Sequence, residues 1–221
     1  PLLIQIKIDI FLRRTHVIIL ILIVLGLIVI PINLVPFLKQ GKKLTFKGWS
    51  FFFLIGIAFM AVEVILIQKY TRFIGPGSYS FVTILFTLLL ASGIGSRFSE
   101  RFKAKTAFGG ILIWILLDVF ILEHLLRIVD FAPLLIRILI AVLIVFPLGF
   151  FMGMPFPKGT KLVGDLIDWG FAVNGAASVL GSTAIMLVAF NYGYNMALIA
   201  GGLAYLLAML IIRSPKNWVK S

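Results

Sequence analysis

The feature that most constrains this chain is a series of continuous apolar runs, each about as long as a membrane is thick. A helix of about 20 apolar residues crosses the hydrocarbon core, where it satisfies its own backbone hydrogen bonds. The runs are continuous, which does not fit the alternating pattern of transmembrane strands. The sequence therefore predicts an all-α membrane protein, a polytopic bundle of about seven transmembrane helices. The seven runs are roughly 17–38, 50–69, 78–96, 107–127, 133–154, 171–190 and 194–212.

Composition excludes several other classes of protein. Hydrophobic residues make up 62% of the chain and charged residues 13%, against about 45–50% and 25% in soluble proteins. An ordinary soluble enzyme and a disordered chain are excluded on this ground. The net charge of +12 comes from cations clustered between the apolar runs, which indicates membrane orientation signals rather than nucleic-acid binding. With no cysteine and two histidines, we expect neither a metal nor another cofactor.

The distribution of lysine and arginine predicts an orientation. With seven spans, 13 of the 20 basic residues fall on one side, in the 38–49 and 97–106 loops, at 158–161 and at the C-terminus. Positively charged loops remain in the cytoplasm. We therefore expect a multi-pass protein of the cell (inner) membrane with a cytoplasmic C-terminus.

Three regions are expected along the chain. Residues 1–48 form an N-terminal segment with one apolar helix and a basic linker, residues 49–213 a six-helix transmembrane domain, and residues 214–221 a cytoplasmic tail. Prolines at 31 and 36 interrupt the first run, which either spans with a kink or re-enters. The chain begins at Pro1 rather than Met. We interpret it as a fragment or processed product, with an upstream soluble domain or a second membrane half as its expected partner beside the bilayer.

The segment GFFMGMPFPKG at 149–159 is the most distinctive motif. Pro155 and Pro157 do not fit a regular helix interior, and Gly153 and Gly159 permit backbone turns. The fifth span should therefore end or break here. One interpretation is a helix terminus followed by a loop, and the other is a broken helix or hinge that lines a cavity.

The segment NGAASVLGS at 174–182 combines polar and small residues with helical spacing. Asn174, Ser178 and Ser182 lie four residues apart on one helix face, beside the small pair Ala177 and Gly181. Small residues allow helices to approach closely, and Ser or Asn can bond between them. Tight packing and a polar substrate path are the two interpretations. We also assign Gly93 and Gly95 to helix packing, because they do not stand in the βαβ context that a dinucleotide-binding loop needs.

Two of the three acids within the apolar runs are candidates for a functional site. Glu63 is about one turn from the end of the second run, and Asp118 is near the middle of the fourth. An ionisable residue within a span is a functional candidate by default. Each acid either pairs across helices or has a role in coupling to a proton or cation.

Four segments in order carry a family resemblance: FMAVEVILIQ at 59–68, LLLASGIGS at 88–96, GMPFP at 153–157 and the motif at 174–182. Over about residues 50–210 the chain resembles the C-terminal membrane region of bacterial spermidine synthase-like proteins, in which an aminopropyltransferase domain is fused to membrane helices. The segment GSRFSERFK at 95–103 also weakly resembles a conserved short loop of major facilitator transporters, although Ser96 replaces the usual acid.

The resemblance implies a membrane domain that anchors a neighbouring aminopropyltransferase domain. Such a domain could also pass a polyamine or other cation, with Glu63, Asp118, Asn174 and Ser178 as candidates for the substrate path. No catalytic residue is expected in this chain, and any transferase activity would belong to the parent protein. Half of a secondary transporter and a purely structural anchor are the alternatives.

Overall fold

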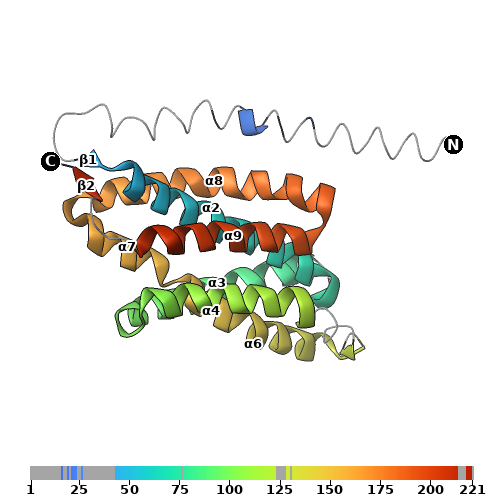
Figure 1. Ribbon diagram of the computed structural model, residues 1–221. Coiled ribbons are helices and arrows are strands. Elements are labelled where there is room, and N and C mark those ends of the chain that lie inside the picture. Colours follow the sequence, from blue (N-terminus) through green and yellow to red (C-terminus); the bar gives the residue numbers. More distant parts are fainter. Residues whose placement is uncertain are drawn as a thin grey trace.

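The computed structural model describes residues 43–75, 77–122, 128–129, 131–213 and 218–220, with a few positions between 16 and 26. Figure 1 shows their arrangement as a bundle of helices. The helices are α2 (Phe46–Ile74), α3 (Gly77–Phe98), α4 (Ala104–Leu117), α6 (Leu134–Met152), α7 (Pro155–Val163), α8 (Ile167–Tyr192) and α9 (Tyr194–Ile212). Short turns follow α3 (Ser99–Arg101, 3₁₀), α4 (Asp118–Leu122, π) and α7 (Gly164–Leu166, 3₁₀), and two short strands are β1 (Lys43–Leu44) and β2 (Val219–Lys220).

The protein is an all-α membrane protein, as the apolar runs predicted. Four stretches are long and apolar enough to cross a membrane: Phe46–Ile74, Gly77–Arg101, Leu134–Tyr192 and Tyr194–Ile212. The expected number of seven transmembrane helices is wrong for the described residues, which hold six long helices and the short α7. The predicted run at 17–38 lies almost entirely outside the described residues. The run at 107–127 is α-helical only as far as Leu117, beyond which a π-helical turn begins at Asp118.

Helix α2 is longer than its apolar run of 50–69, because it includes residues 46–49 before the run and 70–74 after it. Thr45 caps the N-terminus by accepting a hydrogen bond from the Gly48 amide at 3.4 Å. Lys69 and Arg72 continue the helix, since lysine and arginine are good helix formers. Gly75 ends it with a φ of +113°, a conformation that favours glycine. An apolar run thus measures the thickness of lipid and not the length of the helix.

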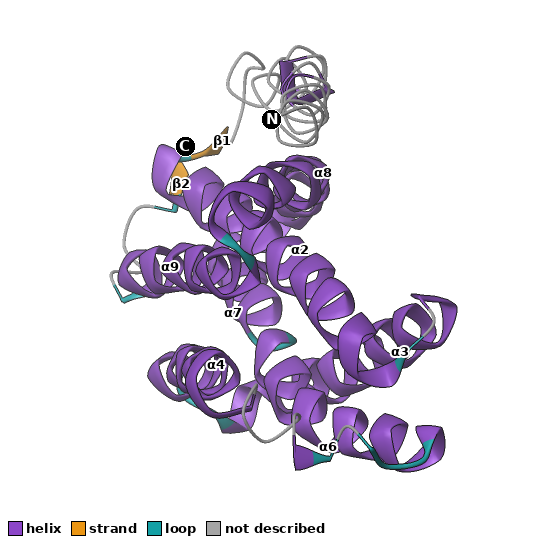
Figure 2. Cartoon of the chain, turned by 90° about the vertical axis from the view of Figure 1, so that its right-hand side faces the viewer, coloured by secondary structure: helices purple, strands orange, loops and turns teal. Residues whose placement is uncertain are grey.

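Helix α2 lies at the centre of the bundle, between α8, α9 and α3 (Figure 2). Helix α6 packs mainly against α3, and α4 lies against α9 and α6. Most of the fully buried large side chains of α2 are apolar, including Phe51, Phe52, Ile65 and Leu66.

Glycines bring two helix pairs into close contact. A Cβ atom at Gly95 would overlap the backbone of Phe150, and one at Gly153 would overlap the backbone of Ser92, so α3 and the end of α6 touch through their main chains. In the second pair, a Cβ at Gly56 of α2 would lie 2.5 Å from the Asn174 carbonyl oxygen of α8. Small residues permit such approach in membranes, where packing rather than water drives association.

The two ends of the bundle differ. At one end β1 pairs with β2 in antiparallel register, Lys43 opposite Lys220, and Trp218 is buried against Phe51. The 99–103 turn and α7 lie at this same end, which we call the basic end. Helix α2 already begins at Phe46, so the boundary expected at residue 49 falls within it. Part of the expected tail, 218–220, also packs on the bundle.

Candidate functional site

A groove of about 360 Å³ lies towards the basic end and is lined by residues of six helices, α2, α3, α6, α7, α8 and α9. Its walls are mostly apolar and aromatic, with a few hydroxyl and amide groups among them. Small-molecule sites commonly have this character and a volume of about 300–1,000 Å³. The lining residues are Ile55, Phe59, Leu89, Ser92, Gly93, Ser96, Met152, Gly153, Pro155, Phe156, Pro157, Phe171, Asn174 and Tyr205.

The proline motif supplies one wall of this groove. Helix α6 ends at Met152 and α7 begins at Pro155, where a proline is tolerated because the first-turn amide needs no helical partner. Gly153, Pro155 and Pro157 line the groove, whereas Gly159 lies against the rings of Phe51 and Phe52 and seats α7 on α2. The motif is therefore both a helix terminus and part of a cavity wall.

The motif of α8 contributes one residue to the groove and several to packing. Asn174 lines the groove and donates from Nδ2 to the Phe52 carbonyl at 3.2 Å. Ser178 donates to the carbonyl oxygens of Asn174 at 2.9 Å and Gly56 at 3.4 Å, so it joins α8 to α2 outside the groove lining.

The small residues that the sequence assigned to helix packing, in the 174–182 motif and at positions 93 and 95, lie in different surroundings. Ala177 is fully buried, and a Cβ at Gly181 would lie 2.7 Å from the backbone of Ile57. Ser182 donates to Val179 within its own helix. Gly93 lines the groove, and a Cβ there would meet nothing within 4 Å, whereas Gly95 is in close contact with α6.

Asp118 belongs to a buried ion-pair cluster at the end opposite the groove. Lys69 Nζ lies 2.5 Å from Asp118 Oδ1 and also donates to the Asp118 carbonyl at 3.0 Å. It further donates to Asn195 Oδ1 at 3.1 Å, and the Tyr70 hydroxyl donates to Asp118 Oδ2 at 3.0 Å. The place of Asp118 in the apolar run had indicated the middle of a span. Asp118 instead lies at the end of α4. The cluster joins α2, α4 and α9.

Two further contacts join helices at this end. The Arg72 guanidinium lies over the Tyr194 ring, 5.6 Å from its centroid. Arg137 Nη1 donates to the Phe73 carbonyl at 2.8 Å. The end opposite the groove is thus held by polar contacts among α2, α4, α6 and α9.

Glu63 is in a different situation from Asp118. The side chain of Glu63 is in the interior, with the residue 7% exposed. It lies near the middle of α2, because the helix extends to Ile74 rather than ending one turn after Glu63. Within the described part of the chain, it has no hydrogen bond or ion pair. Glu63 follows the groove residue Phe59 by one helical turn.

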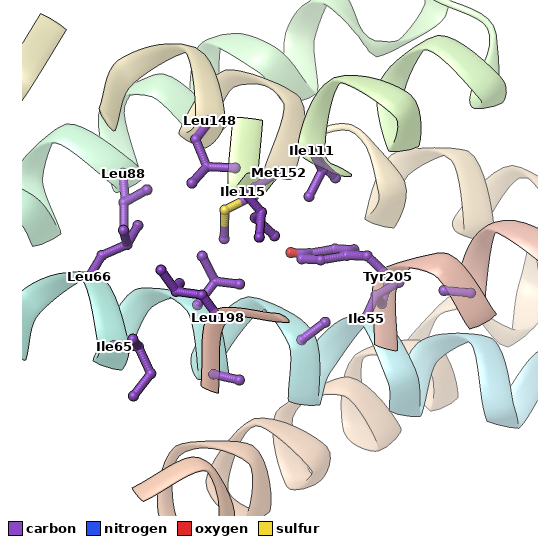
Figure 3. Close-up of a cluster of buried hydrophobic side chains, with 14 of the residues drawn as sticks. Ile55, Ile65, Leu66, Leu88, Ile111, Ile115, Leu148, Met152, Leu198 and Tyr205 are labelled. Atoms are coloured by element: carbon purple, nitrogen blue, oxygen red, sulfur yellow. The ribbon is translucent and has the colours of Figure 1, made fainter. Parts of the chain in front are cut away.

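Tyr205 faces the same region from α9. The residue is 1% exposed, and its hydroxyl has no hydrogen-bond partner among the described residues. Tyr205 lines the groove, and one turn before it Gly201 packs against Val62, the neighbour of Glu63. Figure 3 shows the ring reaching from α9 into the buried cluster, with its oxygen directed to the side where Met152 and Ile115 lie in this view.

The structure separates the two acids that the sequence grouped together. Lys69, the partner of Asp118, stands six positions after Glu63, which corresponds to about 9 Å along a helix at 1.5 Å per residue. They also project about 120° apart around α2, at 100° per residue. Glu63 therefore lies apart from the Lys69–Asp118 cluster, one helical turn from the groove residue Phe59.

The lysines of α7 hold the turn after α3. Lys158 Nζ donates to the carbonyl oxygens of Ser99 at 2.6 Å and Phe102 at 2.5 Å, and exposed Lys161 pairs with Glu100 at 2.5 Å. These contacts join α7 to the 99–103 turn at the basic end of the bundle.

The sequence did not single out four residues as site residues: Lys69, Tyr205, Ser92 and Ser96. Lys69 is the last residue of the apolar run 50–69. Tyr205 stands within an apolar run, where nothing in the local pattern distinguishes a groove residue from a lipid-facing one. Only the packing of the helices places Lys69 in the ion-pair cluster and Tyr205 in the groove lining.

These features define a class of protein, a helical membrane protein with a groove at one end of its bundle and a buried ion-pair cluster at the other. No protein-family model, curated protein or solved structure matches the chain. Among the described residues, no group of three His, Cys, Asp or Glu side chains could hold a metal ion.

Proposed function

We propose that this chain is a solute-binding membrane domain whose groove opens at the basic end, and that it anchors a neighbouring domain in the parent protein. The observation that carries the proposal is the asymmetry of the bundle. Six helices line a groove near the basic end, whereas the Lys69–Asp118 cluster joins three helices at the other end. Such an arrangement is suited to admitting a small solute from one side of the membrane.

The charge distribution supports a cytoplasmic mouth for this groove. Of the described basic residues in 43–220, three lie towards the opposite end: Lys69, Arg72 and Arg137. The other ten lie at the basic end, and the positive-inside rule places such an end in the cytoplasm. A cytoplasmic domain of the spermidine synthase-like kind would then face the mouth of the groove and could exchange a small cation with it.

Half of a secondary transporter is the second candidate. One observation favours it: the groove is at one end while the other end is held by a polar cluster. Transporters that work by alternating access have a site near the midplane that is reached from one side at a time. A purely structural anchor needs neither a groove nor a buried Glu63 that lacks a partner among the described residues.

The proposal can be tested by labelling single cysteines, because the chain has no cysteine of its own. Ser96→Cys and Ser92→Cys place a thiol in the groove, and Thr87→Cys on the same helix is the buried control. Each variant is treated with a membrane-impermeant cationic methanethiosulfonate in inside-out and right-side-out vesicles.

We expect Ser96→Cys and Ser92→Cys to react in inside-out vesicles, with Ser96→Cys reacting faster because it lies nearer the mouth. Thr87→Cys should not react in either preparation. Failure of Ser92→Cys to react from either side would contradict a groove that admits solutes. Reaction only in right-side-out vesicles would reverse the proposed orientation.

A further inference from the structure

We propose that Glu63 and Tyr205 form the binding site for the protonated amino group of an organic monoamine, whose apolar body lies in the groove. This inference rests on the proposed function and names the class of solute. It assigns the acidic recognition of the site to Glu63 alone.

The buried charged side chains differ in whether they have a partner. Among the described residues, the buried charged side chains are Glu63, Lys69 and Asp118. Lys69 and Asp118 pair with each other at 2.5 Å, whereas Glu63 has neither an ion pair nor a hydrogen bond in that part of the chain. A charge without a partner is costly within a membrane, so such residues typically mark a substrate or ion pathway.

The Tyr205 hydroxyl is an independent observation, because it belongs to another helix and is another kind of group than the Glu63 carboxylate. A buried tyrosine hydroxyl usually finds a partner, but that of Tyr205 has none among the described residues and belongs to the groove lining. An ammonium group has three N–H donors and no acceptor. A carboxylate and a hydroxyl oxygen from facing helices provide acceptors of the kind it needs.

The apolar lining indicates the rest of the ligand. Phe59 stands one turn before Glu63, and Met152, Phe156 and Phe171 provide further apolar surface. Aromatic faces attract cations and also bury an aromatic or alkyl body. The volume of about 360 Å³ is near the lower limit for small-molecule sites, which suits an amine with one ring or a short alkyl chain.

Glu63 stands one helical turn beyond the groove residue Phe59, and the lack of any acid in the groove lining itself favours a monoamine over a polyamine. The lining residues include no Asp or Glu. Asp118 was the second candidate acid, but Lys69 occupies its Oδ1 and Tyr70 its Oδ2. A second ammonium group along the groove would therefore meet only hydroxyl, amide and carbonyl groups. The polyamine expected from the family resemblance is thus less well matched than a singly charged amine.

The test uses Ser92→Cys as a reporter in the full chain, reconstituted in nanodiscs. The rate of methanethiosulfonate labelling is measured against the concentration of benzylamine, benzyl alcohol or putrescine. We expect benzylamine to slow labelling, and the neutral benzyl alcohol of nearly the same shape to have little effect. Putrescine should protect more weakly than benzylamine.

Variants then assign the recognition to residues. We expect Glu63→Gln to raise the benzylamine concentration for half-protection at least about tenfold, because it removes a charge-assisted hydrogen bond. Tyr205→Phe should raise it about three- to tenfold, and Glu63→Asp should retain part of the protection. Glu100→Gln is the matched control, because it neutralises an exposed acid at the basic end that pairs with Lys161. Its protection should equal that of the parent reporter.

The outcomes separate this inference from the proposed function. If Ser92→Cys does not react at all, the groove and the amine site fail together. If it reacts but benzylamine gives no protection, or protection that Glu63→Gln leaves unchanged, the amine site is wrong and the groove stands. Equal protection by benzyl alcohol would exclude recognition of charge. Stronger protection by putrescine would replace the monoamine with a polyamine.

Discussion

The two ion pairs of this protein have the same length and very different surroundings, which allows a matched test of burial. Lys69–Asp118 and Lys161–Glu100 both measure 2.5 Å. The side chains of the first pair are 9% and 3% exposed, and those of the second are 57% and 71% exposed. We predict that Lys69→Met strongly destabilises the protein and that Lys161→Met does not.

The magnitude follows from what each substitution leaves behind. Lys69→Met leaves the Asp118 carboxylate buried with the Tyr70 hydroxyl as its remaining side-chain donor. Removing one partner of a buried pair costs about 3–5 kcal/mol. At about 2–4 °C per kcal/mol for a chain of this size, the midpoint of thermal unfolding should fall by roughly 10 °C. Solvent screens the Lys161–Glu100 pair, so Lys161→Met should leave the midpoint unchanged within error.

The assay heats detergent-solubilised protein and follows the monodisperse fraction by size-exclusion chromatography with tryptophan fluorescence. The double variant Lys69→Met/Asp118→Leu provides a second check, because an apolar pair often replaces a buried ion pair with little loss. We expect it to recover at least half of the loss caused by Lys69→Met. Equal midpoints for Lys69→Met and Lys161→Met would refute the reasoning from burial.

Three further predictions concern packing, the groove and the α7 turn. Gly153→Ala should lower the free energy of unfolding by about 1–3 kcal/mol, because the added Cβ would overlap the Ser92 backbone. Gly93→Ala should be tolerated, because a Cβ there would meet nothing within 4 Å, and thermal unfolding compares the two variants. Tyr205→Phe should raise the free energy of unfolding by about 1 kcal/mol while weakening amine protection, because it removes a buried hydroxyl without a partner among the described residues. Lys158→Met should increase proteolytic cleavage near Ser99, because it removes two hydrogen bonds to that turn, and timed digestion of membranes measures the change.

The sequence alone was sufficient to predict a helical membrane protein and the end of a helix near Gly153. Both are local properties of the chain. The length of an apolar run is set by the thickness of the bilayer, and a proline disrupts a helix interior wherever it stands. The span count was less accurate, because an apolar run such as 107–127 does not reveal that its α-helix gives way to a π turn at Asp118.

The partners of the charged residues were decided by the tertiary structure. Glu63 and Asp118 looked alike in the sequence, since each is an acid within an apolar run. Which one meets a lysine depends on the rotation and relative position of α2 and α4. Lys69 lies at the level of Asp118 and on its side of α2, and so Asp118 is paired.

The groove likewise depends on how helices pack. Gly93, Gly153, Pro155, Pro157 and Asn174 were singled out for different reasons, and the bundle brings them to one surface. Tyr205 had only a weak signal in the sequence, its four-residue spacing from Gly201 and Ala197, because its role depends on which neighbours α9 places against α2. Helix formation in lipid is settled by each segment and its own backbone hydrogen bonds, but a site requires the distances between segments, which only the assembled bundle determines.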